Sequence, residues 1–279
     1  MKTTCPFPPM TRAEYDAVDA VNWSTLKYAL TSGLHYRHCI AQATEETDAM
    51  RLGRAIHAMV FEPDTFDDEF AVWEGGRRAG GEWSQFKDTH LTQTIIRGED
   101  LQAALDIAEA VNRHPVAGPI LANGAAEVSI TWTDPQTGIA CKGRMDWLTD
   151  TVLVDLKSTK SIDARAFGVH AAAMLYHCQL AFYAGGLSAN GAERDAKIIA
   201  VESSPPYDVA VCSLTDDDLW AGEVRVQQAL ETVQKCRKTR TWPGQYQEEV
   251  PLALPGYVFP SDDEVDAWLK EGVLERLPR

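Results

Sequence analysis

Apolar residues recur with a helical period in three stretches of the first half of the chain. The second stretch stops near Pro63 and the third stops at Pro115, because proline cannot continue a helix. These patterns predict helices over residues 24–40, 50–61 and 99–114. Two other stretches lack a clear period. Residues 1–20 are predicted to form a weakly structured leader. Residues 62–98 are predicted to form a long irregular segment.

The period changes from helical to extended after residue 125. Alternating residues separated by turn-forming residues predict a meander of three strands, over 126–132, 139–148 and 152–157. The remaining pattern predicts a helix over 164–187, strands over 196–202 and 207–214, and a last helix that begins at Thr215. This order of helices and strands is typical of an α/β protein.

Composition excludes several classes of protein. The chain has 279 residues, of which 45% are hydrophobic, so it can bury a sizeable core and is neither disordered nor fibrous. No apolar run approaches the roughly 20 residues that cross a bilayer, so we expect no membrane protein. The six cysteines show no paired spacing and the N-terminus lacks an apolar signal region, which favours a reducing, cytoplasmic setting.

The net charge limits what the chain can bind. Acidic residues outnumber basic ones by 41 to 26, which gives a formal net charge of -15. The whole-molecule field therefore repels nucleic acid. A phosphate-binding function would need cations or metal ions concentrated within about 10 Å, the range over which salt does not screen them.

Acidic residues are predicted to converge in the meander. If the second hairpin turns at Asp150 and Thr151, residues whose numbers sum to 301 lie opposite each other, which places Asp146 opposite Asp155. Two like charges in such a pair are unfavourable unless a cation lies between them. The first hairpin pairs positions that sum to 272 or 273, so Glu127 lies beside Met145 or Asp146.

Basic residues share the faces of these acids. Strand alternation places Asp155 and Lys157 on one face, with Leu156 on the other, and sets Lys142 and Arg144 on the face of Asp146. Carboxylates select Mg²⁺ or Mn²⁺, which can activate a water against a phosphodiester. A solvated strand face is the alternative, but the apolar run before Asp155 indicates a central strand, where an unpartnered acid and lysine are costly.

Several motifs resemble one known family. Glu127, 141–146, 154–157 and 176–183, with weaker matches at 24–27, 52–57, 81–87 and 242–244, resemble the RecE-like phage and prophage exonucleases of the PD-(D/E)XK superfamily. The chain departs from the literal motif because Met145 precedes Asp146. The resemblance implies an α/β fold with a PD-(D/E)XK nuclease core, in which helices flank a central mixed β-sheet. It implies a single domain over 21–279, with an N-terminal helical elaboration (21–118), a catalytic core (119–240) and a C-terminal extension (241–279).

The resemblance also implies an activity. Members of this family are Mg²⁺-dependent exodeoxyribonucleases that degrade linear double-stranded DNA from 5′ to 3′ and leave 3′ single strands for a single-strand annealing protein in phage-type recombination. We therefore expect Mg²⁺ as cofactor with Mn²⁺ as a substitute, a ring-shaped homo-oligomer, and a place in the cytoplasm of a bacterial host cell. We expect no iron–sulfur cluster, because Cys39 and a solitary Cys236 do not supply the four cysteines that related enzymes use.

The family motifs assign residues to roles. The implied metal ligands are Asp146, Asp155, Glu127, His57 and the backbone carbonyl of Leu156, and the implied catalytic lysine is Lys157. The implied DNA contacts are Gln179, Tyr183, Tyr176, Arg144, Lys142 and Arg54. For His57 the alternative is a buried core histidine, and for Gln179 and the two tyrosines it is an ordinary amphipathic helix surface.

The sequence leaves two other functions open. One is a RecB-like nuclease that prefers single-stranded DNA ends. The other is a non-catalytic protein whose acidic surface mimics DNA or binds a partner, which the net charge of -15 favours.

Overall fold

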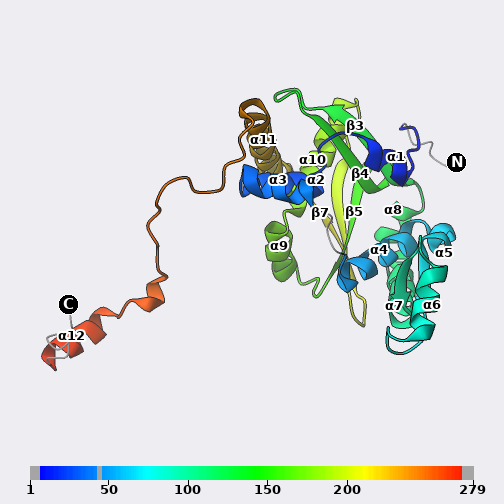
Figure 1. Ribbon diagram of the computed structural model, residues 1–279, viewed down its shortest axis with the longest axis horizontal. Coiled ribbons are helices and arrows are strands. Elements are labelled where there is room, and N and C mark those ends of the chain that lie inside the picture. The colour runs from blue at the N-terminus through cyan, green and yellow to red at the C-terminus, as the bar shows by residue number, and fades with distance from the viewer. Residues whose placement is uncertain (1–6, 43–45, 272–279) are drawn as a thin grey trace. The chain divides into compact units, whose positions relative to one another are not determined.

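A five-stranded mixed sheet is the largest sheet of the structure, a computed structural model (Figure 1). Its strands lie in chain order, and only β5 and β6 are parallel. The strands are β3 (Ala125–Thr133), β4 (Ala140–Leu148), β5 (Val152–Thr159), β6 (Asp195–Glu202) and β7 (Val209–Ser213). The predicted meander and the two later strands are therefore confirmed, as is the mixed sheet flanked by helices.

The structure describes residues 7–42 and 46–271, which belong to two compact units, 1–244 and 245–279. The larger unit holds the sheet. The smaller one contains a short 3₁₀ helix, η3 (Gly256–Val258), and α12 (Asp262–Lys270), which a capping box between Ser261 and Glu264 begins. Among the described residues, no helix is both long and apolar enough to cross a membrane.

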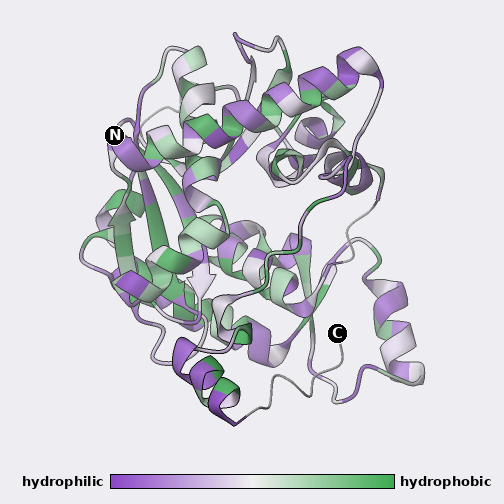
Figure 2. Cartoon of the chain, turned by 90° about the vertical axis from the view of Figure 1, so that its left-hand side faces the viewer, coloured by the Kyte–Doolittle hydropathy of each residue, from purple (hydrophilic) through white to green (hydrophobic). Residues whose placement is uncertain are grey.

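Helices cover both faces of the sheet. On one face, α4 (Asp48–Phe61) and α7 (Gly98–Arg113) enclose a core with Val154 and Leu156. On the other face, α10 (Tyr176–Ala189) and α11 (Asp216–Thr239) enclose a second core with Leu153. Figure 2 shows hydrophobic residues concentrated on the strands and hydrophilic ones on much of the helical surface. The sheet is buried on both sides where its central strands carry continuous apolar runs, over 152–154 in β5 and 198–201 in β6.

The remaining elements of the larger unit are short. The N-terminal ones are α1 (Arg12–Ala17), α2 (Trp23–Leu26), η1 (Lys27–Leu30) and α3 (Gly33–Ala41). Those between the two main helices of the first face are η2 (Pro63–Thr65), α5 (Phe66–Glu69), β1 (Phe70–Trp73), α6 (Gly81–Thr89) and β2 (Thr94–Arg97). The last two are α8 (Ala117–Leu121) and α9 (Ala164–Ala173).

The prediction of an irregular segment over 62–98 is wrong. β1 and β2 pair in parallel, and α6 connects them. Each strand has only four residues, which is too short for a period to be recognised in the sequence.

Two predicted helices are each interrupted. The helix expected over 24–40 is divided before α3, where the Ser32 side chain accepts a hydrogen bond from the His35 amide and caps a new helix. The helix expected over 164–187 is divided into α9 and α10 at Leu175, whose φ is 60°. A left-handed residue ends the helical path, so Tyr176 begins α10 in a new direction.

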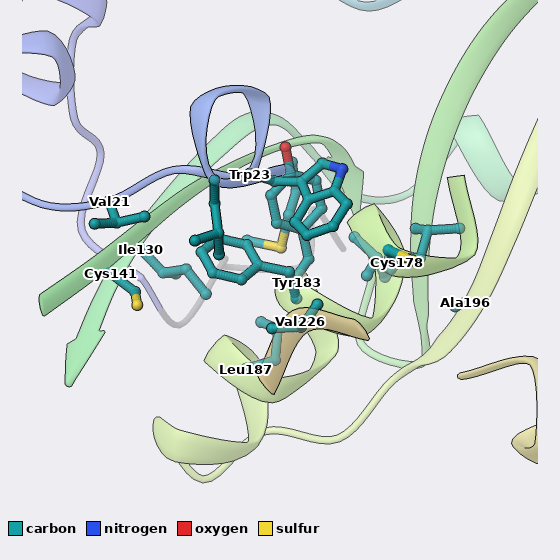
Figure 3. Close-up of a cluster of buried hydrophobic side chains, with 14 of the residues drawn as sticks. Val21, Trp23, Ile130, Cys141, Cys178, Tyr183, Leu187, Ala196 and Val226 are labelled. Atoms are coloured by element: carbon teal, nitrogen blue, oxygen red, sulfur yellow. The ribbon is translucent and has the colours of Figure 1, made fainter. Parts of the chain in front are cut away.

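The leader prediction is also wrong for the part that the structure describes; residues 1–6 lie outside it. A capping box between Thr11 and Glu14 begins α1, and Val21 forms a parallel bridge with Cys141 of β4. Figure 3 shows Val21 close to Cys141, and Trp23 in the same buried cluster as Tyr183. The N-terminal segment, residues 10–21, is therefore ordered and packs against the sheet at β4.

The strands β4 and β5 separate beside this segment. Their ladder consists of Trp147–Val154 and Leu148–Leu153, which is the predicted register, with sums of 301. It ends before Asp146 and Asp155 are reached, so these two acids are not a ladder pair. Val21 instead pairs with the free edge of β4 further along, at Cys141. The two central strands thus diverge at the predicted acids, and we call this divergence between the strands the cleft.

Candidate metal centre

The Asp146 carboxylate stands where the β4–β5 ladder ends. Its Oδ2 accepts a hydrogen bond of 2.8 Å from the backbone amide of Leu156, in place of a backbone carbonyl. Burial, together with the charge of Glu127, raises the pKa of Asp146 to about 6, although the charge of Lys157 opposes the shift. Ionising this carboxylate is therefore costly unless a cation binds beside it.

Glu127 approaches Asp146 from β3 through an unusual backbone. Its φ is 51°, a left-handed conformation that is strained for a residue with a side chain. The strand changes faces there: Ala126 packs against the core beneath α4, whereas Val128 lies in the core beneath α10. Residues two apart would share a face in a regular strand. The register sums to 273, the value that sets Glu127 beside Asp146.

The same change of face occurs at Asp146. Met145 is buried in the core beneath α10, whereas Trp147 packs against the core beneath α4. Both acids therefore lie where their strands twist between the two cores, which brings their carboxylates together at the cleft. The distortion explains how neighbouring strands can present two acids to one point.

His57 completes a cluster of three possible metal ligands. Ligand atoms of His57, Glu127 and Asp146 all lie within 4.8 Å of one another. His57 Nε2 is 3.0 Å from the carbonyl oxygen of Leu156, which can only accept, so Nε2 carries the proton. Nδ1 lies 3.5 Å from Asp146 Oδ2. Burial, and then the charge of Lys157, lowers the pKa of His57 and keeps the ring neutral.

This arrangement is the one that metal-binding histidines use, in which a carbonyl fixes the tautomer and the other nitrogen faces the ion. The predicted ligand His57 is thus brought to the two acids. The Leu156 carbonyl, also predicted as a ligand, accepts from His57 and orients its ring.

Asp155 and Lys157 form a buried pair beside the cluster. Asp155 is 1% exposed, and its Oδ2 lies 2.6 Å from Lys157 Nζ. Oδ1 is buried without a hydrogen-bond partner among the described residues. Burial raises the pKa of Asp155 to about 6 despite the lysine. Burial alone would lower the pKa of Lys157, but the negative charges of Asp155 and Asp146 outweigh the effect of burial and raise this pKa. The lysine is therefore charged, and it lies on the same face as Asp155, as strand alternation predicts.

The ring of Tyr176 also contacts the ammonium of Lys157. Lys157 Nζ lies 5.0 Å from the centre of the Tyr176 ring, a cation–π contact. Tyr183 is buried, and a Cβ at Gly143 would lie 2.9 Å from its ring, so glycine is required there for the contact. Gln179 Nε2 donates to the Tyr183 hydroxyl at 3.3 Å, and the two share a helix face as predicted.

The predicted basic residues are already engaged. Arg144 Nε donates to Glu127 at 2.5 Å, and its Nη1 donates to Ser129 and to the Met10 carbonyl. Arg54, on α4, pairs with Glu46 at 2.9 Å and remains half-exposed. Of the cations predicted beside the acids, Arg144 is therefore in the cleft and supports Glu127.

Lys142 is not part of the cleft. It is 5% exposed, and its Nζ donates to three backbone carbonyls at the end of α1, those of Tyr15, Asp16 and Val18. The expectation that it concentrates positive charge at the acids is corrected, because its ammonium holds the N-terminal segment instead.

Two residues near the site were not predicted. Glu62, at the end of α4, is half-buried; burial and the charge of Glu127 raise its pKa. Burial opposes the charge of the Arg12 guanidinium on α1, but the hydrogen bond and charge of Asp16, together with the charge of Glu127, raise its pKa. The Thr11–Glu14 capping box was a sequence signal for α1; we find none that indicates Glu62.

The donor set fits a hard divalent cation. The carboxylates of Glu127 and Asp146, with that of Asp155 beside them, could supply oxygen, and His57 could supply one neutral nitrogen. The unpartnered Oδ1 of Asp155 and the raised pKa values of two acids are what such a site shows before an ion neutralises it.

Comparison with known proteins identifies the family and the fold. The model of a family described as "PDDEXK-like domain of unknown function (DUF3799)" matches residues 23–250. A crystal structure from Eubacterium rectale, described as a "Putative exonuclease", shares 15% sequence identity with a TM-score of 0.55, and the alignment covers 88% of this chain and 97% of that one. The structure of SSO0001 shares 17% identity over 76% of this chain and 85% of that one, but its TM-score of 0.30 supports no inference. No curated protein matches.

Proposed function

The chain belongs to the PDDEXK-like domain family, and from this premise we propose that it is a divalent-metal-dependent nuclease. More specifically, we propose an exodeoxyribonuclease that degrades linear double-stranded DNA from 5′ to 3′ and leaves 3′ single strands for recombination by annealing. The fold and the family support a nuclease. The direction, the duplex substrate and the annealing partner rest on the motif resemblance, and the description of the Eubacterium rectale protein favours an exonuclease.

The observation that carries the proposal is the buried Asp155–Lys157 pair next to three further ligand atoms. An acid and a lysine in a central strand lose more solvation than their attraction returns unless they serve a function. Their position directly beside the His57, Glu127 and Asp146 cluster gives them one. A protein that acts only through an acidic surface has no need for this arrangement.

The proposed roles follow from the contacts. Glu127, Asp146, Asp155 and His57 would hold Mg²⁺, or Mn²⁺ in its place. The bound ion would supply Lewis-acid activation of water and stabilise charge on the phosphodiester. Lys157 keeps its proton because Asp155 and Asp146 stabilise it, so its ammonium orients the attacking water or a phosphate oxygen by donating hydrogen bonds. Tyr176 and Asp155 fix the direction of that ammonium.

The site also answers the electrostatic problem of an acidic nuclease. The net charge of -15 opposes DNA binding everywhere else. A divalent ion and Lys157 reverse the sign locally, and the half-exposed Arg54 lies one helical turn from His57. We propose that Arg54, Gln179 and Tyr176 contact DNA near the cleft, and that the active form is a ring-shaped homo-oligomer.

Digestion of end-labelled DNA tests the function. Wild type, Asp155→Ala and the exposed control Asp263→Ala are incubated with linear duplex and covalently closed circular DNA, in Mg²⁺ or in EDTA. We expect Mg²⁺-dependent loss of the 5′ label from linear DNA only, by wild type and by Asp263→Ala. Asp155→Ala should lose at least about 10³-fold in rate, because it removes a metal ligand and the partner of the lysine.

Other outcomes would reject parts of the proposal. A strong preference for single-stranded ends would replace the duplex substrate by that of a RecB-like nuclease. Absence of cleavage with Mg²⁺ and with Mn²⁺ would reject the enzyme and favour a non-catalytic partner-binding protein.

A further inference from the structure

An apolar groove lies between α10, α11 and the β3–β4 turn, with a volume of about 630 Å³. Trp132, Phe182 and Leu230 line it, and each belongs to or packs against the buried core. The α11 side carries Trp220 and Val224, which are 66% and 40% exposed. Large exposed apolar side chains that gather at a concave surface indicate a binding site.

The groove carries charge of one sign. Glu223 and Glu231 of α11 line it, together with Asp134 from the β3–β4 turn. Among the residues that the structure describes, no lysine, arginine or histidine lines it. An occupant with positive charge and apolar side chains would therefore complement both the apolar walls and the negative charge of the groove. DNA would be repelled.

The length of the groove suggests the shape of the occupant. Glu231 follows Trp220 by eleven positions on one helix, which is roughly 16 Å or three helical turns. A helix that lies in a groove anchors apolar side chains at positions three and four apart, over about this length. The described C-terminal segment 245–271 is a poor candidate, because it has one lysine, no arginine and several acids.

We propose that this groove docks a short amphipathic helix of a partner protein, one that presents apolar side chains and lysine or arginine. Trp220 is the anchor, since tryptophan dominates the energy of such interfaces, and the two glutamates of α11 select the cationic face. The surface is separate from the metal ligands and is independent of the nuclease activity.

Binding of designed peptides to the full chain tests the proposal. The probes are two labelled twelve-residue helical peptides, one of leucine and lysine and one of leucine and glutamate, followed by fluorescence anisotropy. The variants are Trp220→Ala and Glu223→Lys/Glu231→Lys. The control, Asp262→Lys/Asp263→Lys on α12, makes the same change in net charge at another surface. DNA cleavage is measured for each variant.

We expect the cationic peptide to bind wild type and the control within about twofold of each other. Its Kd should rise at least about tenfold in the Glu223→Lys/Glu231→Lys variant and about fivefold in Trp220→Ala, with cleavage rates unchanged in all. Equal loss in the control would show non-specific attraction to an acidic protein and overturn the proposal. So would equal binding of the glutamate peptide, no binding of either peptide, or self-association of the chain that Trp220→Ala abolishes. If wild type does not cleave DNA, the proposed nuclease function is rejected, whereas the proposal of a docking groove is unaffected.

Discussion

At the scale of single residues, the site is defined by acids that are more costly to ionise than usual. Asp146 and Asp155 both have pKa values raised to about 6, mainly by burial. The folded chain therefore holds more protons than the unfolded chain between about pH 4 and 6, so the contribution of these acids to stability is lost as the pH rises through 6. Metal binding, which needs the ionised acids, should weaken below pH 6.

This balance predicts that Asp146→Asn stabilises the protein while it destroys function. The asparagine side-chain oxygen can still accept from the Leu156 amide, and the buried charge is gone. Without metal at pH 8, we expect the free energy of unfolding to rise by about 1–3 kcal/mol. At pH 4 the gain should vanish, because the aspartate is then neutral in wild type too. Thermal unfolding in EDTA at both pH values measures it; equal effects at the two would contradict the pKa shift as its cause.

A second prediction separates the two members of the buried pair. Lys157→Met should abolish cleavage yet change the Kd for Mn²⁺ by less than about threefold, since the lysine is not a ligand. Asp155→Ala should lose both cleavage and metal affinity. Calorimetric titration with Mn²⁺ measures the affinity. A comparable loss of metal binding in the two variants would remove the proposed role of Lys157.

At the scale of elements, sequence periodicity predicted the parts that have a strong local signal. The register of both hairpins follows from their turns, and the shared face of Asp155 and Lys157 follows from alternation. Periodicity fails where one residue redirects the backbone. The left-handed Glu127 reverses the faces of β3, and the left-handed Leu175 divides a predicted helix.

Contacts between distant segments were also beyond prediction. Lys142 shares a strand face with Asp146 in the sequence pattern, but its acceptors lie more than 120 positions earlier, at the end of α1. No local pattern marks such a contact. The same segment reaches the candidate metal centre, because the Met10 carbonyl accepts from Arg144, which pairs with Glu127.

Lys142→Met should therefore release the N-terminal segment. The change leaves three carbonyls of the α1 end without their donor, which we expect to lower the free energy of unfolding by about 2–3 kcal/mol. Trypsin should then cleave after Arg12 much faster than in wild type, and metal affinity should fall because Arg144 loses its support. Lys160→Met, at an exposed lysine, is the control and should change neither. Unchanged proteolysis in Lys142→Met would show that α1 is held by other contacts.

At the scale of the whole molecule, the net negative charge of the chain opposes the binding of DNA that the proposed function requires. The chain carries a net charge of -15, and the cations nearest the acids are committed to internal pairs, Arg144 to Glu127 and Lys157 to Asp155. In the proposed nuclease, the positive field that DNA requires would then come largely from bound metal. The metal is thus expected to control binding of the substrate as well as its hydrolysis.

This leads to a prediction about binding without cleavage. In the Lys157→Met variant, a short duplex should bind at least about tenfold more tightly in Mg²⁺ than in EDTA at matched ionic strength, where screening is equal. In Lys157→Met/Asp146→Asn, which lacks a ligand, Mg²⁺ should have little effect. Fluorescence anisotropy measures both. If the duplex binds equally well in EDTA, a basic surface elsewhere on the assembled protein must hold the DNA, and the cleft would then act only in the chemical step.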